Sequence, residues 1–397
     1  MNIVGIIAEY NPLHNGHVYH IKKAKELTNA DYVVVLMSGS FTEQGNIAVL
    51  DKFTRAKIAI ENGADLVIEL PTIYATSSAE NFAKGAINIL NSLGCITHLA
   101  FGAETDNIEA LQEIAKTCID KEGQIISDTK EYLKQGITSA MARDNALKAL
   151  LKPKYHEMIN KPNNILGIEY LKSLYGLKSQ IKPVLIKRFK SSHNDCKIVN
   201  SGEYTSSTAI RETLSTSTLT LEETVKSISQ FVPQNVIYEL TKNDFKTNEN
   251  IWKFLKYEII RLGKDGLKNI AEVTEGLENK LYDSVAKSNS YNEYIATVKS
   301  KRYTLSRIKR ICVYIILGIT KDLRESLKDV NYCRILKVKE SSKDLLSLIS
   351  NSATNTIITK FTDNIQDTHT LSSIKLDLLA NNISHNLNED YTNNIIC

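Results

Sequence analysis

The sequence lacks the features that mark several large classes of protein. Its cysteines are Cys95, Cys118, Cys196, Cys312, Cys333 and Cys397. Because they are scattered and form no C-x-x-C pair, neither a disulfide framework nor a zinc site is expected. The longest apolar run, Ile311 to Ile319, is too short to cross a bilayer. No basic segment precedes the first apolar stretch, and Glu9 interrupts it before any cleavage-like site, which is atypical of a signal peptide. We therefore expect a soluble, cytoplasmic protein.

A strong charge of one sign is also lacking. The 49 basic residues balance 45 acidic ones, and the formal net charge is only +4. This balance by itself indicates no nucleic-acid partner, so such a partner must be inferred from local clusters of cations. The chain has no internal repeat, and its 42% hydrophobic and 24% charged residues are typical of a globular protein. Its length of 397 residues predicts two or three domains.

The N-terminal half of the chain alternates between short apolar runs and helical patterns. The runs that we expect to be strands are Ile3 to Ala8, Tyr32 to Met37, Leu66 to Leu70, His98 to Gly102 and Pro183 to Lys187. The helical patterns cover Asn15 to Thr28, Lys52 to Asn62, Ala79 to Leu93, Asn107 to Lys121 and Thr129 to Leu151. Strands that alternate with helices predict a parallel sheet with right-handed crossovers. We therefore expect an α/β fold with a Rossmann-like domain over residues 1–213.

Beyond residue 213 the pattern changes. A Ser/Thr-rich linker at 214–221 overlaps Thr220-x-x-Glu223, the sequence of a capping box that begins a helix. The chain is then mainly helical in pattern, which predicts a helical domain over residues 214–328. Residues 329–397 combine short apolar runs with polar turns, so we expect a small mixed region there. The Asn-rich tail beyond Asn381 is expected to be mobile.

The strongest functional signal is the turn between the first strand and the first helix, His14-Asn15-Gly16-His17. Ligands of open parallel sheets bind beyond the carboxyl ends of the strands, where free N–H groups and the helix dipole attract anions. Gly16 lets the backbone approach a phosphate, and the two histidines, on one helix face, can both donate to it. The alternative is a pair of capping or metal-binding histidines in a surface loop, but the position at a strand end favours a phosphate site.

A second element, Ser206 to Arg211, follows the fifth predicted strand. Ser206, Ser207 and Thr208 place three hydroxyls at a helix start, and Arg211 follows one turn later, which suits a phosphate clamp. Such runs are common helix caps, so this element alone indicates little. Together with the histidine turn, it predicts a site for nucleotidyl transfer.

Other polar residues near the strand ends have two possible roles each. The segment from Asp51 to Arg55 begins a helix that either contacts a substrate or is solvated. Glu69 and Glu104, on the ligand side of the sheet, either bind magnesium with the nucleotide or are buried structural acids. Asn163 and Asn164 precede an apolar helix, so we expect one of them to cap it, and a cap could also contact the adenine or ribose.

A basic segment without a single acidic residue precedes the apolar run at 311–319. Its cations are Lys299, Lys301, Arg302, Arg307, Lys309 and Arg310. If the segment is helical throughout, Lys299, Arg302 and Lys309 lie on one stripe. Such a stripe, with Tyr303 interleaved, suits the phosphates and unstacked bases of RNA. The alternatives are a charged helix that docks on the acidic side of the first domain, and cations that reach into the ATP cleft.

The H-x-G-H turn and the later S-S-T-x-I-R element resemble the HIGH-type nucleotidyltransferase superfamily, which includes class I aminoacyl-tRNA synthetases. Its members bind ATP between these two elements and transfer AMP or CMP with release of pyrophosphate. A closer resemblance, to bacterial tRNA(Met) cytidine acetate ligases, rests on motifs from both predicted domains. They are G-I-I-A-E-Y-N-P-L-H-N-G-H from Gly5 to His17, Met37-Ser-Gly-Ser-Phe41 with Gln44-Gly45, Phe101-Gly-Ala-Glu104, Asn163-Asn-Ile-Leu-Gly167 and Lys301-Arg-Tyr-Thr304.

The resemblance implies that the enzyme uses ATP to activate acetate as acetyl-adenylate. The acetyl group then passes to N4 of the wobble cytidine of elongator tRNA(Met), which forms N4-acetylcytidine. His14 and His17 are implied to stabilise the adenylation transition state. By resemblance the ATP pocket is formed by Ile7, Ala8, Glu9, Tyr10, Asn11, Pro12, Leu13, His14, Asn15, Gly16, His17, Val18, Tyr19, His20, Gly102, Asn164 and Arg188. Magnesium is expected with the nucleotide, with no ligands identified, and the oligomeric state is open.

The second phosphate element, Ser206 to Arg211, differs from its counterpart in the synthetases. Synthetases carry a lysine-rich KMSKS loop, whereas Arg211 is the only cation of the element here, so we expect Lys187 and Arg188 to supply further charge. Two other functions are compatible with the motifs. One is an adenylyltransferase for a small phosphorylated metabolite, which would have little use for the helical region. The other is a non-catalytic factor that binds ATP and RNA.

Overall fold

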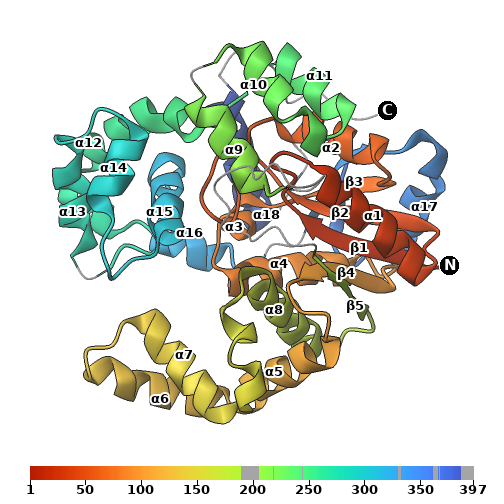
Figure 1. The fold of residues 1–397 in the computed structure, drawn as a ribbon, viewed down its shortest axis with the longest axis horizontal. Coiled ribbons are helices and arrows are strands. Elements are labelled where there is room, and N and C mark those ends of the chain that lie inside the picture. Colours follow the sequence, from red (N-terminus) through yellow and green to blue (C-terminus); the bar gives the residue numbers. More distant parts are fainter. Residues whose placement is uncertain are drawn as a thin grey trace.

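The computed structural model describes residues 1–188, 205–217, 219–243, 245–274, 276–329, 332–360, 365 and 367–385. The described residues form a seven-stranded sheet with helices on both faces (Figure 1). The strands are β1 (Ile3–Ala8), β2 (Tyr32–Ser38), β3 (Leu66–Leu70), β4 (His98–Ala103), β5 (Lys182–Lys187), β6 (Tyr332–Val338) and β7 (Thr356–Ile358). They lie in the order β5-β4-β1-β2-β3-β6-β7.

Helices follow the first strands and continue to the end of the described chain. The helices of the first half are α1 (Asn15–Thr28), α2 (Lys52–Glu61), α3 (Thr72–Ala75), α4 (Ala79–Ser92), α5 (Ile108–Asp120), α6 (Glu122–Lys134), α7 (Ser139–Leu150) and α8 (Pro162–Gly176). Those of the second half are α9 (Ser207–Thr216), α10 (Leu221–Ser227), α11 (Gln234–Lys242), α12 (Trp252–Lys268), α13 (Leu277–Val285), α14 (Tyr291–Val298), α15 (Leu305–Leu317), α16 (Lys321–Ser326), α17 (Asp344–Ser352) and α18 (Thr368–His385).

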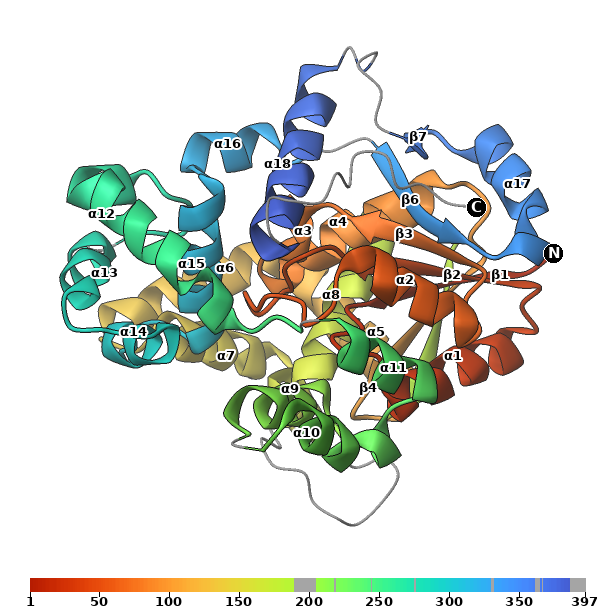
Figure 2. The same ribbon diagram turned by 90° about the horizontal axis from the view of Figure 1, so that it is seen from above.

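The central strands are apolar because both faces of the sheet are covered. Along β2, Val33, Val35 and Met37 belong to a core shared with α1, α2, α9 and α11. Val34 and Leu36, which point the opposite way, belong to a core shared with α4, α5 and α8. Figure 2 shows the sheet from above, with α1, α2 and α11 on the near side.

The order of strands reverses at β1, which pairs in parallel with β2 on one side and with β4 on the other. Ile6, for example, lies opposite Val35 of β2 and Ala100 of β4. Strand β4 pairs in parallel with β5, and β2 with β3. Such a switch point leaves a crevice at the carboxyl ends of the strands, which is where open α/β sheets bind ligands.

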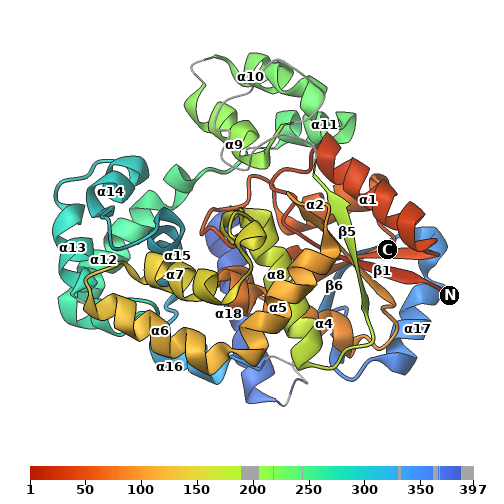
Figure 3. The same ribbon diagram turned by 60° about the horizontal axis from the view of Figure 1, so that its bottom comes forward.

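The five strands expected from the sequence are present, with ends that differ by no more than one residue. The single helix expected from Thr129 to Leu151 is wrong. Its first part belongs to α6, which begins at Glu122, and its second part to α7. The break falls at Gly136, which has φ +80°, a left-handed conformation that interrupts a helix and that glycine adopts at little cost. The two helices pack against each other beside the sheet (Figure 3).

Residues of the C-terminal region extend the same sheet. Strand β6 lies antiparallel to β3, and β7 pairs with β6, so the sheet is mostly rather than wholly parallel. Helix α18 continues through Asn381 to His385, so the expected mobile tail begins as a helix, and its remainder at 386–397 lies outside the described residues. Four cysteines are described, and all four are free thiols. Cys196 and Cys397 lie outside the described residues.

Helices α9 to α16 occupy the region that the sequence identifies as helical. The capping box at Thr220 is confirmed, because its Oγ1 accepts from the backbone N–H of Glu223 and the Glu223 carboxylate accepts from the backbone N–H of Thr220. Helix α9 continues to Thr216, so the Ser/Thr-rich linker begins later than expected. Helices α12 to α16 form a group at one side of the sheet (Figure 1). None of the described helices is long and apolar enough to cross a membrane.

Candidate active site

A cleft lies at the carboxyl ends of β1, β4 and β5, between α1, α8 and α9. Together with its opening to solvent it encloses about 1440 Å³. It is lined by Ile6, Ile7, Ala8, Glu9, Tyr10, His14, Gly16, His17, Tyr19, His20, Glu43, Gln44, Phe82, Phe101, Gly102, Asn163, Leu166, Tyr170, Ile186, Lys187, Arg188, Thr205, Ser206, Ser207, Thr208 and Arg211.

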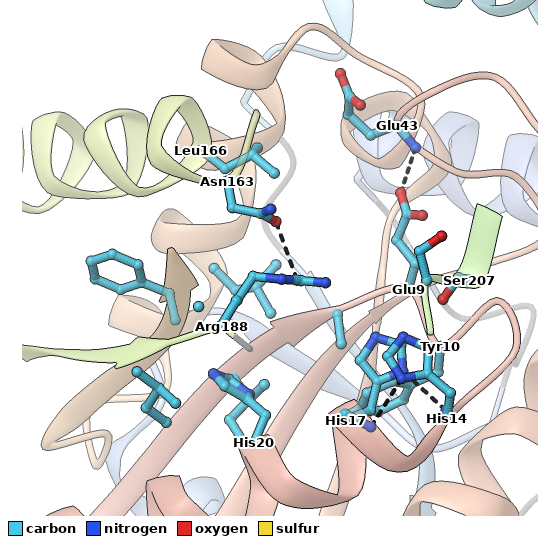
Figure 4. Close-up of a pocket in the computed structure, with 18 of the residues that line it drawn as sticks. Glu9, Tyr10, His14, His17, His20, Glu43, Asn163, Leu166, Arg188 and Ser207 are labelled. Carbon is cyan, nitrogen blue, oxygen red and sulfur yellow. Dashed lines mark hydrogen bonds between the residues drawn. The ribbon is translucent and has the colours of Figure 1, made fainter. Parts of the chain in front are cut away.

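His14 and His17 cap the first helix with their own side chains. Nδ1 of His14 accepts a hydrogen bond from the backbone N–H of Gly16 (3.1 Å), and Nδ1 of His17 accepts one from the backbone N–H of His14 (3.2 Å). The two rings stack with their centroids 3.7 Å apart, and Tyr10 meets His17 edge-on. The histidines are therefore helix caps, as one alternative from the sequence has it, and they also line the cleft (Figure 4).

The hydrogen bonds at Nδ1 determine the chemistry of both rings. Because Nδ1 accepts in each case, the neutral imidazole carries its proton on Nε2. Burial, together with the nearby charges of Arg188 and Arg211, lowers the pKa of His14 to about 3. Burial also holds the pKa of His17 well below its usual value. At pH 7 both side chains are therefore neutral, and each has an Nε2–H that can donate to an anion.

The beginning of α9 is attached to the histidine turn. Oγ of Ser206, the N-cap, accepts from a backbone N–H of the first helical turn (3.0 Å). Oγ of Ser207 donates to the carbonyl of Pro12 (3.3 Å), and Nη1 of Arg211 donates to the carbonyl of the residue before that proline (2.7 Å). Nη2 of Arg211 also donates to Oγ1 of Thr208 (3.1 Å). The structure thus brings together the two elements that the sequence pairs as a phosphate site.

Arg188, just beyond β5, adds a second cation to the cleft. Its Nη1 donates to Oδ1 of Asn163 (3.2 Å), and its guanidinium points into the middle of the site (Figure 4). The side chain crosses Gly102, where a Cβ atom would come within 3.2 Å of Cγ of Arg188. Lys187 also lines the cleft, but its Nζ pairs with Asp106 at the exposed surface (2.6 Å). Arg188 is therefore the cation that this strand supplies.

Glu104 attaches the first turn of α8 to the end of β4. Its carboxylate accepts from the backbone N–H groups of Asn163 (3.2 Å) and Asn164 (2.9 Å) and from the side-chain amide of Asn163 (2.7 Å). Oδ1 of Asn164 accepts in return from the backbone N–H of Glu104 (3.0 Å). The prediction that one asparagine caps this helix is wrong, because both lie within its first turn and Glu104 satisfies their N–H groups. Of its two possible roles, Glu104 has the structural one.

Both cations at the beginning of α2 are buried, so the alternative of a solvated helix start does not hold for them. Lys52 and Arg334 pair with the two carboxylate oxygens of Glu69, at 2.6 Å and 2.9 Å, and all three side chains are almost fully buried. Glu69 is therefore a structural acid. Arg55 is equally buried and donates to backbone carbonyls at the ends of both β1 and β2, among them that of Glu9 (2.7 Å). Arg55 thus connects the loops after β1 and β2, which form one side of the cleft.

Carboxylates lie on the β2 side of the cleft. The carboxylate of Glu9 accepts from the backbone N–H of Glu43 (2.9 Å), as Figure 4 shows. Burial raises the pKa of both groups, that of Glu43 to about 7, although Arg310 lowers it in part. Tyr170, which lines the cleft nearby, has its own pKa raised by burial and by both carboxylates. This side of the cleft therefore presents carboxyl and phenol oxygens rather than cations.

The basic segment is not helical throughout, so the predicted stripe does not form. Helix α14 ends at Val298 and α15 begins at Leu305, with a turn between them. Lys299, Lys301 and Arg302 are exposed in this turn. The six cations therefore belong to two different structures, an exposed turn and the first turns of a packed helix.

The three later cations contact the body of the protein. Arg310 is buried, and its guanidinium lies 3.6 Å from the carboxylate of Glu43 and 3.3 Å from that of Glu272. Nζ of Lys309 donates to Oδ1 of Asn46 (3.0 Å). Nη2 of Arg307 donates to the backbone carbonyl of Glu272 (2.8 Å). For Lys309 and Arg310 the structure matches the alternative of a helix that docks on the first domain, whereas Arg307 contacts the helical region itself.

Some residues of the predicted ATP pocket do not line the cleft. They are Asn11, Pro12, Leu13, Asn15, Val18 and Asn164. Asn11 holds the loop before α2, because its side chain bonds to the backbone of Ile47 and of Val49. Asn15 donates to the carbonyl of Gln230 (2.9 Å). These residues shape the walls, and their contact with ATP remains a prediction.

Other lining residues were given no role by sequence reasoning. Gln44, Phe101 and Leu166 fall within motifs that carry the resemblance, so the motifs themselves were the available signal, and Glu43 directly precedes Gln44. Phe82 and Tyr170 lie inside helices with ordinary apolar patterns. Only the packing of α4 and α8 against the sheet brings them to the cleft.

The site has the parts of a nucleotidyltransferase. A Rossmann-like sheet presents two neutral imidazoles, hydroxyls and two guanidinium groups to one cleft, which is the arrangement that stabilises a transferring nucleotide. Within the described ranges, no group of three or more His, Cys, Asp or Glu side chains is arranged to hold a metal ion. The family model described as HIGH nucleotidyl transferase matches residues 1–395, so fold and site define a member of this class.

Comparison with individual proteins narrows the class to one family. The chain is 40% identical over 410 residues to the tRNA(Met) cytidine acetate ligase of Clostridium botulinum (strain Hall), covering 98% of this chain and 97% of the relative. It is 39% identical over 407 residues to that of Clostridium perfringens, covering 98% of each. The crystal structure of apo Thermotoga maritima TmcAL superimposes with a TM-score of 0.89 at 32% identity, covering 97% of this chain and 94% of that one. The same protein bound with alpha-thio ATP gives a TM-score of 0.87. The chain belongs to the tRNA(Met) cytidine acetate ligase family.

Proposed function

We propose that the protein uses ATP to activate acetate and then acetylates N4 of the wobble cytidine of elongator tRNA(Met), in the cytoplasm. The observation that carries this proposal is the junction of α1 and α9. There two Nε2–H donors lie beside Ser207, Thr208 and Arg211 in a chain that matches the acetate ligases over 98% of its length. The match extends through the helical region, which an adenylyltransferase of small metabolites would not need.

In the first step, an acetate oxygen attacks the α-phosphorus of ATP, the bond to the β-phosphate oxygen breaks, and acetyl-adenylate and pyrophosphate result. His14 and His17 donate from Nε2 to the phosphoryl oxygens, where negative charge builds up. As neutral donors held by their caps they need no rearrangement during the reaction, which is the condition for strong electrostatic stabilisation. Arg188 and Arg211 neutralise the triphosphate, and Ser206, Ser207 and Thr208 bind its oxygens.

Magnesium is proposed to arrive with the triphosphate. Mg²⁺ prefers oxygen ligands, keeps several waters and is usually bound through substrate phosphates in such sites. Phosphate oxygens in this cleft fit that requirement, whereas Glu69 and Glu104 are both engaged by cations or N–H groups of the protein. The ion would neutralise charge on the phosphates, while the histidines and arginines of this chain orient them.

We assign tRNA binding first to Lys299, Lys301 and Arg302, because they are exposed and close together in the turn before α15. The later cations mainly contact other parts of the protein; they are Arg307, Lys309 and Arg310. We propose that they support tRNA binding by holding this turn in place.

The test separates the two half-reactions. Acetate-dependent exchange of labelled pyrophosphate into ATP measures the first one, and mass spectrometry of tRNA after incubation with ATP and acetate detects N4-acetylcytidine from the second. We expect exchange only with acetate present, and loss of exchange in the His14→Ala/His17→Ala variant. Exchange without acetate, or with a different acid only, would refute the proposal. Full turnover by the double variant would favour a non-catalytic role of the histidines.

A further inference from the structure

The two sides of the cleft differ in chemistry. The side formed by α1, α9 and β5 presents N–H donors and cations, which suit phosphates. The side formed by the loops after β1 and β2 presents Glu9, Glu43 and Gln44, with Tyr170 beside them. Carboxylates repel both the triphosphate and acetate. These groups instead suit a ligand that donates hydrogen bonds, such as an amine.

Glu43 is available to such a ligand. Its backbone N–H donates to the carboxylate of Glu9. Within the described part of the chain, the carboxylate oxygens of Glu43 itself accept no hydrogen bond. The nearest cation, Nη1 of Arg310, is 3.6 Å away, and the side chain is 20% exposed. The hydroxyl of Tyr10, which also lines the cleft, is buried and has no partner among the described residues either. Two polar groups of the cleft thus remain for a ligand to satisfy.

The loop that carries Glu43 rests on the helix that follows the exposed cations. Gly45, with φ +72°, packs so closely against the backbone of Lys309 and Arg310 that a Cβ atom would lie 2.4 Å from the nitrogen of Arg310. Asn46 accepts from Lys309. A tRNA that binds at the exposed turn before α15 is therefore held at the end of the cleft where Glu43 lies.

We propose that Glu43 forms the subsite for the target cytosine and accepts a hydrogen bond and then a proton from its N4 amine. This inference rests on the proposed function. A carboxylate is the side chain that reads the N4 amine of cytosine, and it rejects uracil, which has an oxygen at the same place. The adenine of ATP also carries an exocyclic amine, so the experiment must distinguish the two bases.

The chemical step follows from this placement. The N4 nitrogen attacks the carbonyl carbon of acetyl-adenylate, a C–N bond forms, and the bond from that carbon to the phosphate oxygen breaks. AMP leaves with the electron pair, and the proton lost from N4 passes to the carboxylate of Glu43 and on to water. Burial, together with Glu9 and Glu272, raises the pKa of Glu43 to about 7, while Arg310 lowers it. The group can therefore both accept and release a proton near neutral pH.

The experiment compares the full-length wild type with Glu43→Gln, which keeps the shape but removes the charge and the ability to accept a proton. The matched control is Glu131→Gln, a change at an exposed glutamate of α6. Two rates are measured for each protein. They are acetate-dependent pyrophosphate exchange and single-turnover transfer to a tRNA(Met) transcript, the latter from pH 6 to 8.5. We expect transfer by Glu43→Gln to fall about 100-fold, with exchange reduced far less, because a positioned general base contributes on this order.

The pH profile gives a readout that a purely structural role would not move. Wild-type transfer should rise with pH through about 7 as Glu43 ionises, and the variant should lose this rise. Equal losses in exchange and transfer, or a raised KM for ATP, would show that the carboxylate serves the nucleotide and would overturn the proposal. So would a variant indistinguishable from Glu131→Gln. Absence of acetate-dependent exchange in the wild type would instead refute the proposed function itself.

Discussion

The histidine turn at 14–17 and the basic segment at 299–310 are both rich in the residue types that bind phosphates, yet they differ in how their structure arises. In the turn, His14 and His17 bond to backbone groups no more than three residues away. In the segment, Arg310 contacts Glu43 and Glu272, which are distant in sequence. The first structure is determined locally, and the second depends on how α15 packs against the rest of the chain. Sequence patterns are accordingly more informative about the first.

The largest expected effect is that of a substitution at His14 on the rate of pyrophosphate exchange. Asparagine is a good N-cap, so His14→Asn keeps the cap but removes the Nε2–H donor. We expect pyrophosphate exchange to fall by roughly 100- to 1000-fold, as for the loss of one donor to a transition state, while the melting temperature stays within a few degrees. His14→Ala serves as the control, because it should lose activity and also about 1 kcal/mol of stability. A fully active His14→Asn would mean that the ring acts only as a cap.

The next effect concerns the packed end of the basic segment. Arg310→Ala removes a buried cation beside Glu43 and Glu272, so we expect about 3 kcal/mol less stability toward urea. Arg302→Ala, a change in the exposed turn, should alter stability by less than about 0.5 kcal/mol. Equal stability of the two variants would contradict the division of the segment into a packed and an exposed part.

The exposed end is tested by its affinity for tRNA. In a Lys299→Ala/Lys301→Ala/Arg302→Ala variant we expect roughly tenfold weaker binding to tRNA(Met). The slope of its salt dependence should be shallower by about two, since each of three phosphate contacts to a single strand contributes about 0.7. The control carries Lys121→Ala, just before α6, with Lys130→Ala and Lys134→Ala on α6, which remove the same charge from another exposed surface. If both variants lose affinity equally, binding depends on total charge rather than on the turn.

The smallest expected effect is the pH dependence of stability that His14 causes. The folded-state pKa of His14 is about 3, against 6.5 when the chain is unfolded. Below pH 6.5 the unfolded chain therefore takes up a proton that the folded chain excludes, and stability falls as pH drops toward 3. His14→Asn lacks this term, so it should gain on the wild type by about 1 kcal/mol per pH unit below 6.5 and by nothing above it. The check is urea unfolding of both proteins at pH 7.5, 6.5 and 5.5.

The parts of the fold that could be predicted are those with a local cause. Strands β1 to β5 are read from continuous apolar runs, and the capping box at Thr220 from the spacing of its two members. The break at Gly136 was missed because glycine also occurs inside helices, and only the conformation of the chain shows that it ends one. The pairing of β6 with β3 was missed because nothing in a short apolar run identifies its partner.

The same distinction holds for the candidate site. The histidines and the hydroxyls of α9 were identified from their place at helix starts, and both line the cleft. The roles of Glu104 and Lys52 were not identified, because a charged residue near a strand end is equally compatible with a ligand and with a buried ion pair. Glu43 and Tyr170 reach the cleft from a loop and a helix face, which only the packed chain brings together.

The antiparallel strand β6 has a consequence for biosynthesis. Strand β3 emerges from the ribosome long before its neighbour at 332–338. At bacterial rates of synthesis the interval is on the order of tens of seconds. Throughout that time the nascent chain carries an open strand edge and lacks Arg334, one of the two cations that pair with Glu69. The catalytic sheet can therefore close only after β6 has been made, and products that terminate before β6 are expected to be substrates for chaperones and proteases.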